Sequence, residues 1–133
     1  MRRTLILAAL TLLLAGCATL DEQECRTKTP AQLGLKDGQQ GYGLWRLDRD
    51  VSSCARFDIP FDRSAYLQAY HQGLLQYCTP ANGAKVGARG ESYEYVCPAD
   101  SEPAFLAQYR PAYNEYMADM HDGHIGPSHW FWH

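Results

Sequence analysis

Residues 79–93 read TPANGAKVGARGESY, and residues 29–42 read TPAQLGLKDGQQGY. With a one-residue gap and a two-residue insertion, both stretches contain Thr-Pro-Ala, then Gly-x-Lys-x-Gly-x-x-Gly, then Tyr. The matched positions in residues 29–42, the first repeat, are Gly34, Lys36, Gly38 and Gly41. Those in residues 79–93, the second repeat, are Gly83, Lys85, Gly87 and Gly90. The chain therefore contains a short internal repeat, and the role of its glycines decides the fold.

Each repeat begins with the signature of a helix start. Threonine is a good N-cap and proline suits the first helical position, which describes both Thr29-Pro30 and Thr79-Pro80. Glycines four residues apart lie on one helix face and let a second backbone approach closely. A fainter echo of the pattern, with Gly73 and Tyr77, lies between the repeats. We therefore interpret the glycines as packing positions of short helices, each covered by an aromatic ring.

The clearest helix is predicted over residues 63–78, with Asp62 as its N-cap and Phe61 packing on Tyr66. One face of this helix collects apolar and small side chains: Tyr66, Leu67, Tyr70, Gly73, Leu74, Tyr77 and Cys78.

Further helices are predicted over residues 43–56 and from Thr79 to about residue 88. A last helix is predicted from Ser101, kinked or split at Pro111, and residues 93–96 are predicted to be extended. No stretch has the long alternation of a sheet. The predicted fold class is mainly α, a small disulfide-stapled domain of short helices with glycine-mediated packing and little or no sheet.

The N-terminus predicts export and lipidation. Arg2 and Arg3 precede a short apolar stretch, which ends in the tetrapeptide LAGC at residues 14–17. This order is typical of a secretory signal, and the tetrapeptide resembles the bacterial lipobox. The resemblance implies cleavage before Cys17, a lipid such as palmitate on Cys17, and, with Ala18 next, retention at the periplasmic face of the outer membrane.

The remaining cysteines and charges fit that compartment. Cys25, Cys54, Cys78 and Cys97 predict two disulfides, and of three possible pairings we favour Cys25 with Cys54 and Cys78 with Cys97. A four-cysteine zinc site is the alternative, although no two of these cysteines have the close spacing of zinc ligands. Removing the signal takes away two of 12 basic residues and none of the 15 acidic ones, so the formal charge becomes −5. This balance argues against nucleic acid as a partner.

The predicted organisation is a signal peptide at 1–16, a tether at 17–28, a helical domain at 29–118 and a tail at 119–133. The tail holds His121, His124, His129 and His133, which predict a possible zinc or copper site because imidazole is a preferred ligand of both metals. Its end, Trp130 to Trp132, could instead rest on a partner or at a lipid interface.

The second repeat is not a nucleotide loop. A P-loop places its lysine after the last glycine and before Ser or Thr, whereas Lys85 lies between glycines. A weaker anion site formed by Lys85, Arg89 and a helix N-terminus stays open. His71 is the one histidine between the signal and the tail, and no nucleophile pairs with it in a known motif, so we expect no cofactor and no catalysis.

The stretches GLKDGQQG and CARFDIPFDRSAYLQAYHQGLLQYCTPANGAKVGARGESYEYVCP, within residues 25–117, resemble the DUF2799 family of bacterial lipoproteins. The resemblance implies the domain boundaries and the cysteine framework, and it implies no activity. We expect a lipid-anchored envelope protein that binds a protein partner or has a structural role. The alternatives are a metal-binding lipoprotein that uses the tail, and an enzyme of unknown type.

Overall fold

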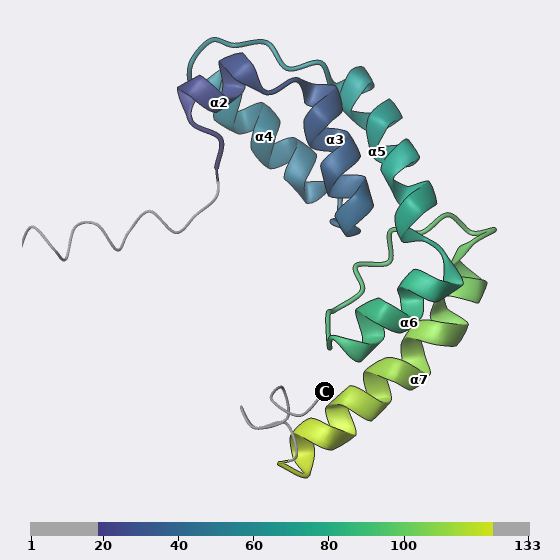
Figure 1. The fold of residues 1–133 in the computed structure, drawn as a ribbon. Coiled ribbons are helices and arrows are strands. Elements are labelled where there is room, and N and C mark those ends of the chain that lie inside the picture. Colours follow the sequence, from purple (N-terminus) through teal and green to yellow (C-terminus); the bar gives the residue numbers. More distant parts are fainter. Residues whose placement is uncertain (1–18, 124–133) are drawn as a thin grey trace, which may run out of the picture.

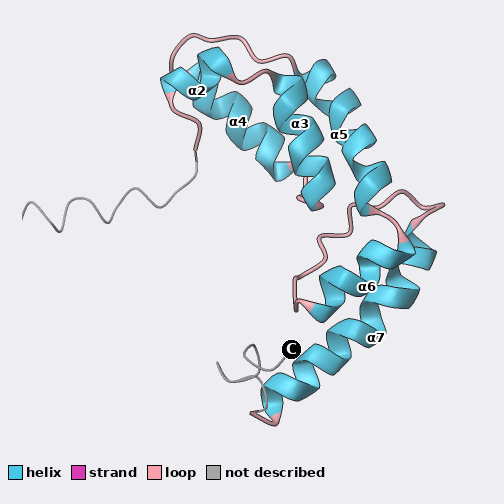
Figure 2. Cartoon of the chain, viewed as in Figure 1, coloured by secondary structure: helices cyan, strands magenta, loops and turns pink. Residues whose placement is uncertain are grey.

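The computed structural model describes residues 19–123, and this range folds into α-helices joined by loops, with no strand (Figures 1 and 2). In chain order the helices are α2 (Glu22–Thr27), α3 (Pro30–Gln40), α4 (Trp45–Ala55), α5 (Arg63–Tyr77), α6 (Pro80–Ala88) and α7 (Glu102–His121). The mainly α class predicted from the sequence is confirmed. None of the helices in this range has the length and apolar character needed to cross a membrane.

Two helical hairpins make up the body of the molecule. In the first hairpin α3 packs against α5, and in the second α6 packs against α7. Figure 1 shows the two hairpins following one another along a curved path, with α2 and α4 beside the first. The apolar core runs through both hairpins, and α5, Tyr93 and α7 contribute most of its aromatic side chains.

Glycines of the repeat make the two helix contacts possible. A Cβ atom on Gly34 or Gly38 would overlap the carbonyl oxygen of Tyr66 or Tyr70 on α5. In the second hairpin a Cβ atom on Gly83 would come within 2.5 Å of the carbonyl oxygen of Phe105 on α7. A Cβ atom on Gly87 would overlap the carbonyl oxygen of Tyr109, one turn further along α7. Backbone therefore meets backbone in both hairpins, and the interpretation of these glycines as packing positions is confirmed.

The first helix of each hairpin ends in the same way. Gly41 and Gly90 have φ angles of 69° and 68°, in the left-handed region that favours glycine. A side chain on Gly41 would enter the ring of Tyr77, and one on Gly90 would enter the ring of Tyr116. Each aromatic ring thus covers the end of the neighbouring helix, but the ring comes from the partner helix and not from Tyr42 or Tyr93 of the repeat itself.

The two hairpins also share a hydrogen bond that the sequence comparison did not reveal. The Tyr70 hydroxyl donates to the carbonyl oxygen of Tyr42 at 2.6 Å, and the Tyr109 hydroxyl donates to that of Glu91 at 2.9 Å. Each acceptor is the residue that follows the left-handed glycine. Because the glycine contacts, the covering ring and this bond all recur, we interpret the hairpins as two versions of one structural unit.

The predicted helix starts are present. Thr29, Asp62 and Thr79 each accept a hydrogen bond from the backbone N–H three residues later, as N-caps do. Phe61 packs beside Tyr66 with the ring centroids 6.1 Å apart. The buried residues of α5 are Tyr66, Tyr70, Gly73, Leu74 and Tyr77, which all lie on the face predicted from the sequence.

Disulfides join Cys25 to Cys54 and Cys78 to Cys97, the pairing favoured above. The first attaches α2 to α4, and the second joins the end of α5 to the loop that precedes α7.

Four local predictions need correction, and the first three concern helices. Part of the predicted tether is helical, because Asp21 and Glu24 form a capping box that starts α2. Pro111 does not split α7, since it lies on an exposed stretch where the unpaired carbonyl group can meet water. The same helix continues to His121, so the first residues of the predicted tail belong to α7.

In the loop between α6 and α7, the prediction that residues 93–96 are extended is wrong at Tyr95. Tyr95 has a φ angle of 56°, which bends the chain in the left-handed region. Such a conformation is uncommon for a residue with a large side chain.

We predict that Gly38→Ala and Gly87→Ala each lower the free energy of unfolding by roughly 3 kcal/mol, because the new methyl group would push α3 from α5 or α6 from α7. Chemical denaturation of the two variants measures this loss. On helix propensity alone, the same changes would stabilise each helix by about 1 kcal/mol. A gain in stability would therefore contradict the close packing.

Gly123→Ala is the matched control for this prediction. Gly123 has a φ angle of 71°, and nothing lies within 4 Å of the position that its Cβ atom would take. The control carries the backbone strain of a left-handed residue without a clash, so we expect a loss of roughly 1–2 kcal/mol.

Candidate functional site

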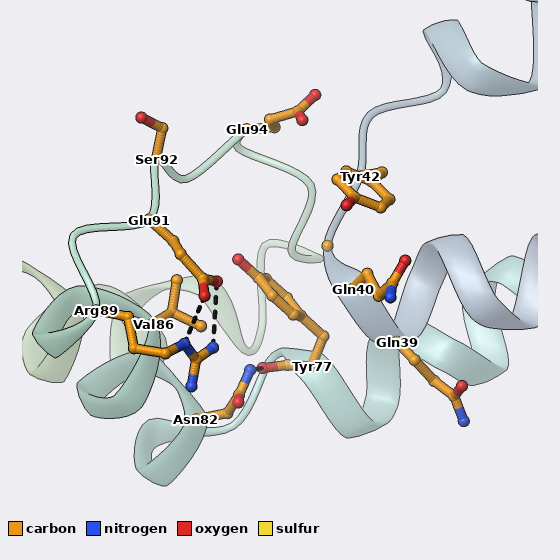
Figure 3. Close-up of a pocket in the computed structure, with 11 residues that line it drawn as sticks. Gln39, Gln40, Tyr42, Tyr77, Asn82, Val86, Arg89, Glu91, Ser92 and Glu94 are labelled. Atoms are coloured by element: carbon orange, nitrogen blue, oxygen red, sulfur yellow. Dashed lines mark hydrogen bonds and ion pairs between the residues drawn. The ribbon is translucent and has the colours of Figure 1, made fainter. Parts of the chain in front are cut away.

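A groove of about 480 Å³ lies where the two hairpins meet (Figure 3). One wall is the end of α3 and its following turn, and the other is α6 with the loop that follows it. The lining residues are Gln39, Gln40, Gly41, Tyr42, Tyr77, Asn82, Val86, Arg89, Glu91, Ser92 and Glu94. Both walls therefore include the C-terminal end of the first helix of a hairpin, and the second wall extends along α6 to Asn82.

Tyr77 links the walls of the groove. Its ring covers Gly41 on one side and stacks on Phe105 at a centroid distance of 5.2 Å on the other. The residue is only 5% exposed. Its hydroxyl group points between the loop of Glu91 and the turn of Tyr42, and it makes no hydrogen bond within residues 19–123 (Figure 3). A buried phenol that ends at an open groove without a partner is available to a ligand.

Burial raises the pKa of Tyr77 to about 12, and the carboxylates of Glu91 and Glu94 act in the same direction. The phenol is therefore protonated at neutral pH, so it can donate a hydrogen bond to a ligand.

The charged groups of the groove are largely committed to one another. Arg89 donates to both carboxylate oxygens of Glu91, with Nη2 3.1 Å from Oε2. Glu94 Oε2 accepts from the backbone N–H of Gly43 at 3.0 Å and from the indole N–H of Trp45 at 2.8 Å. The second oxygen of Glu94, Oε1, makes no hydrogen bond within the described range. One positive and two negative charges leave the groove with a net charge of −1.

The loop that carries the acidic residues is held firmly. It begins at the left-handed Gly90 and ends at Cys97, which is disulfide-bonded to Cys78. Between these points the Tyr93 hydroxyl accepts from the backbone N–H of Cys97 at 2.9 Å and donates to a Glu102 carboxylate oxygen at 2.8 Å. The groove wall is therefore preorganised for binding.

A second polar group is buried under α4 in the first hairpin. The Tyr66 hydroxyl donates to Asp37 Oδ2 at 2.7 Å. Arg46 Nε lies 3.1 Å from Asp37 Oδ1, which is an ion-pair distance, but the N–H makes no hydrogen bond. Asp50 is 1% exposed, and its Oδ1 accepts two bonds from Arg49. Its Oδ2 has no hydrogen-bond partner within the described residues. Burial accordingly raises the pKa of Asp50, and the nearby Asp37 carboxylate adds to the effect.

The second hairpin has an apolar pair in place of this polar one. Asp37 follows Lys36 in the first repeat, as Val86 follows Lys85 in the second, and Tyr66 on α5 occupies the place that Phe105 takes on α7. The polar pair contacts α4, which has no counterpart among the described elements of the second hairpin. The Asp37–Tyr66 pair thus serves the attachment of α4.

The structure does not bring the sequence-predicted anion ligands to a helix N-terminus. Lys85 is exposed in the last turn of α6, and Arg89 is its C-cap residue, bound to Glu91. These positions lie at the end where carbonyl groups, rather than N–H groups, are unpaired. His71 is exposed beside Tyr70, and no hydrogen bond ties it to a nucleophile in the described range.

The remaining predicted sites lie mostly outside the described residues. Cys17, the predicted lipidation site, precedes them, and His124, His129 and His133 follow them. His121 is the exposed last residue of α7. Within residues 19–123 no three His, Cys, Asp or Glu residues are grouped as metal ligands would be. The metal site of the tail stays a prediction.

Sequence reasoning missed Tyr77, Glu94 and Asp50 as candidate functional residues. In the sequence, Tyr77 was recognised only as part of a buried helix face. The direction of its hydroxyl could not be predicted, because it depends on how the hairpins meet. The two-residue insertion in the second repeat was the available signal, because it lengthens the loop that forms one wall.

A family model described as a protein of unknown function (DUF2799) matches residues 31–114 of the chain. The match starts within α3 and ends within α7, so it includes both hairpins and the groove between them. No curated protein matches the chain, and no solved structure matches it.

We predict that Asp50→Asn raises the melting temperature at pH 7. The pKa of Asp50 is higher in the folded state than its ordinary value of 3.8, so folding favours the protonated form. The stabilisation is complete below the unfolded-state pKa and is lost as pH rises through the folded-state pKa. The gain from Asn should therefore shrink as pH falls toward 4 in a series of thermal melts.

Asp62→Asn makes the same chemical change at an exposed helix cap, where Asn is also a good N-cap. We expect no comparable gain from it. Destabilisation by Asp50→Asn at pH 7 would show that the bonds from Arg49 outweigh burial.

Proposed function

The chain belongs to the DUF2799 family, whose function is unknown, and we propose that it is a lipid-anchored, non-catalytic binding module of the cell envelope. In this proposal the lipid on Cys17 holds the protein at the periplasmic face of the outer membrane. The groove between the two hairpins holds a ligand or a segment of a partner. The observation that carries the binding role is the groove with the hydroxyl of buried Tyr77, which has no hydrogen-bond partner within residues 19–123.

Anchoring is supported by the sequence of the N-terminus and by the disulfides. A basic start, a short apolar stretch and LAGC at residues 14–17 are typical of an exported lipoprotein. Two disulfides within a chain of this size are typical of an oxidising compartment such as the periplasm.

Binding without catalysis is supported by the kinds of groups that line the groove. They are amides, hydroxyls, aromatic rings, an internal ion pair and the Glu94 carboxylate, which form hydrogen bonds and contacts. A catalytic site needs a nucleophile or general base with a pKa tuned to its task. In the groove, the pKa of Tyr77 is raised further from neutral pH, and the charges of Arg89 and Glu91 neutralise each other.

We predict that Cys17→Ser abolishes labelling of the protein by a palmitate analogue, because the residue that carries the lipid is gone. Cys25→Ser with Cys54→Ser is the control, because it removes two disulfide-bonded cysteines without touching the predicted lipid site. Retention of the label by Cys17→Ser would contradict lipidation at this residue.

A photo-crosslinking side chain in place of Gln40 tests the groove in cells. Gln40 lines the groove, whereas Gln108 is exposed on α7 and lies outside it. We expect a discrete crosslinked product from position 40 and none from position 108. Equal products from both positions, or none from either, would contradict a binding role for the groove.

A further inference from the structure

The rim of the groove carries an aromatic side chain that is exposed and yet held in place. Trp45 is 53% exposed at the start of α4. Its indole N–H donates to Glu94 Oε2, which belongs to the opposite wall, at 2.8 Å. The guanidinium groups of Arg46 and Arg49 lie 5.7 and 5.5 Å from its ring. A tryptophan fixed in this way loses little conformational entropy on binding, as an anchor in a protein interface should.

A second exposed aromatic side chain follows Glu94 on the same loop. Tyr95 is 75% exposed, and its ring lies 5.0 Å from that of Tyr93. Its left-handed backbone conformation costs on the order of 1 kcal/mol in a residue other than glycine. Strain that directs an aromatic ring into solvent is typical of a functional position. Trp45 is therefore bonded to Glu94, and Tyr95 follows Glu94 directly in the chain.

The charges beside this rim favour a cation. Arg46 and Arg49 are paired with the buried carboxylates of Asp37 and Asp50, and Arg89 is paired with Glu91. Among the described residues, an arriving anion would therefore find no arginine at the groove without a carboxylate partner. Glu94 keeps one oxygen without a hydrogen bond in the described range, and Asn82 uses its amide nitrogen on the Tyr77 carbonyl oxygen, which leaves its side-chain oxygen as an acceptor.

We propose that the groove binds an extended polypeptide segment that carries a lysine or arginine side chain. The basic group would lie against Glu94 and the acceptors of the groove, while neighbouring apolar side chains rest on Trp45 and Tyr95. The Tyr77 hydroxyl would donate to a backbone carbonyl oxygen of the segment. This inference rests on the proposed binding function and specifies the chemistry of the partner.

A polypeptide explains the surface better than a small amine does. A small amine would use the carboxylate and leave the two exposed aromatic rings without a role. Aromatic residues are enriched in the anchoring positions of protein interfaces. The formal charge of −5 for residues 17–133 would also favour encounter with a basic partner.

Peptide titrations test the proposal on the ¹⁵N-labelled Cys17→Ser protein. The probes are acetyl-Leu-Lys-Leu-amide, acetyl-Leu-Glu-Leu-amide, cadaverine and chitotriose. The readouts are the indole N–H resonance of Trp45, assigned with Trp45→Phe, and the backbone resonances of residues 91–95. We expect the lysine peptide to shift these resonances and the other three probes to leave them in place.

Substitutions then assign the contacts. Glu94→Gln should weaken binding of the lysine peptide about tenfold, because the neutral amide still accepts a hydrogen bond from Trp45 but no longer attracts a cation. Tyr77→Phe keeps the ring over Gly41 and should weaken binding of the lysine peptide about fivefold, since one hydrogen bond to the peptide is lost. Glu115→Gln removes one exposed charge from α7 and should leave the affinity unchanged.

Each opposite result overturns the inference. Equal binding of the glutamate peptide would exclude the charge preference, and equal shifts from cadaverine would show that no polypeptide is needed. Binding of chitotriose alone would assign the groove to a glycan. If no probe binds while position 40 still forms its discrete crosslinked product in cells, the basic-peptide inference is wrong and the binding function stands. If that product is also missing, both are wrong.

Discussion

The structure depends on the direct contact of helix backbones at glycine. Side chains usually keep helix axes 8–10 Å apart. Here Gly34 and Gly38 meet carbonyl groups of α5, and Gly83 and Gly87 meet those of α7. Short helices have little stability of their own, so the contact surface must hold them. With this close approach, α6 can be held along its whole length although it has only nine residues.

Much of the fold could be predicted because its signals are local. The N-caps Thr29, Asp62 and Thr79, the glycine spacing and the buried face of α5 are written in neighbouring residues. The α2 helix was missed because it buries no side chain, and its disulfide partner lies 29 residues away. The groove was missed for a related reason. It depends on how the hairpins meet, and no periodic pattern in one segment reports the direction of the Tyr77 hydroxyl.

The two hairpins show how one unit can acquire different tasks. Both keep the glycines, the covering ring and the tyrosine hydrogen bond to the turn. They differ where the first hairpin must accommodate α4, since Asp37 and Tyr66 replace the apolar pair Val86 and Phe105. They also differ where the second repeat has two extra residues, which lengthen the loop of Glu91 and Glu94. The positions that differ between the hairpins therefore form the Asp37–Tyr66 pair under α4 and the acidic loop of the groove.

The disulfide between α2 and α4 has a mechanical consequence. Because α2 buries none of its own residues, it is held beside α4 mainly by the bond between Cys25 and Cys54, with Leu20 buried just before the helix and the backbone continuing into α3 after it. A pull on the N-terminus would load this covalent bond and then α4, while the glycine contacts of both hairpins lie beyond it along the chain. A force applied at the N-terminus would thus act on the disulfide before it could separate the helices of either hairpin.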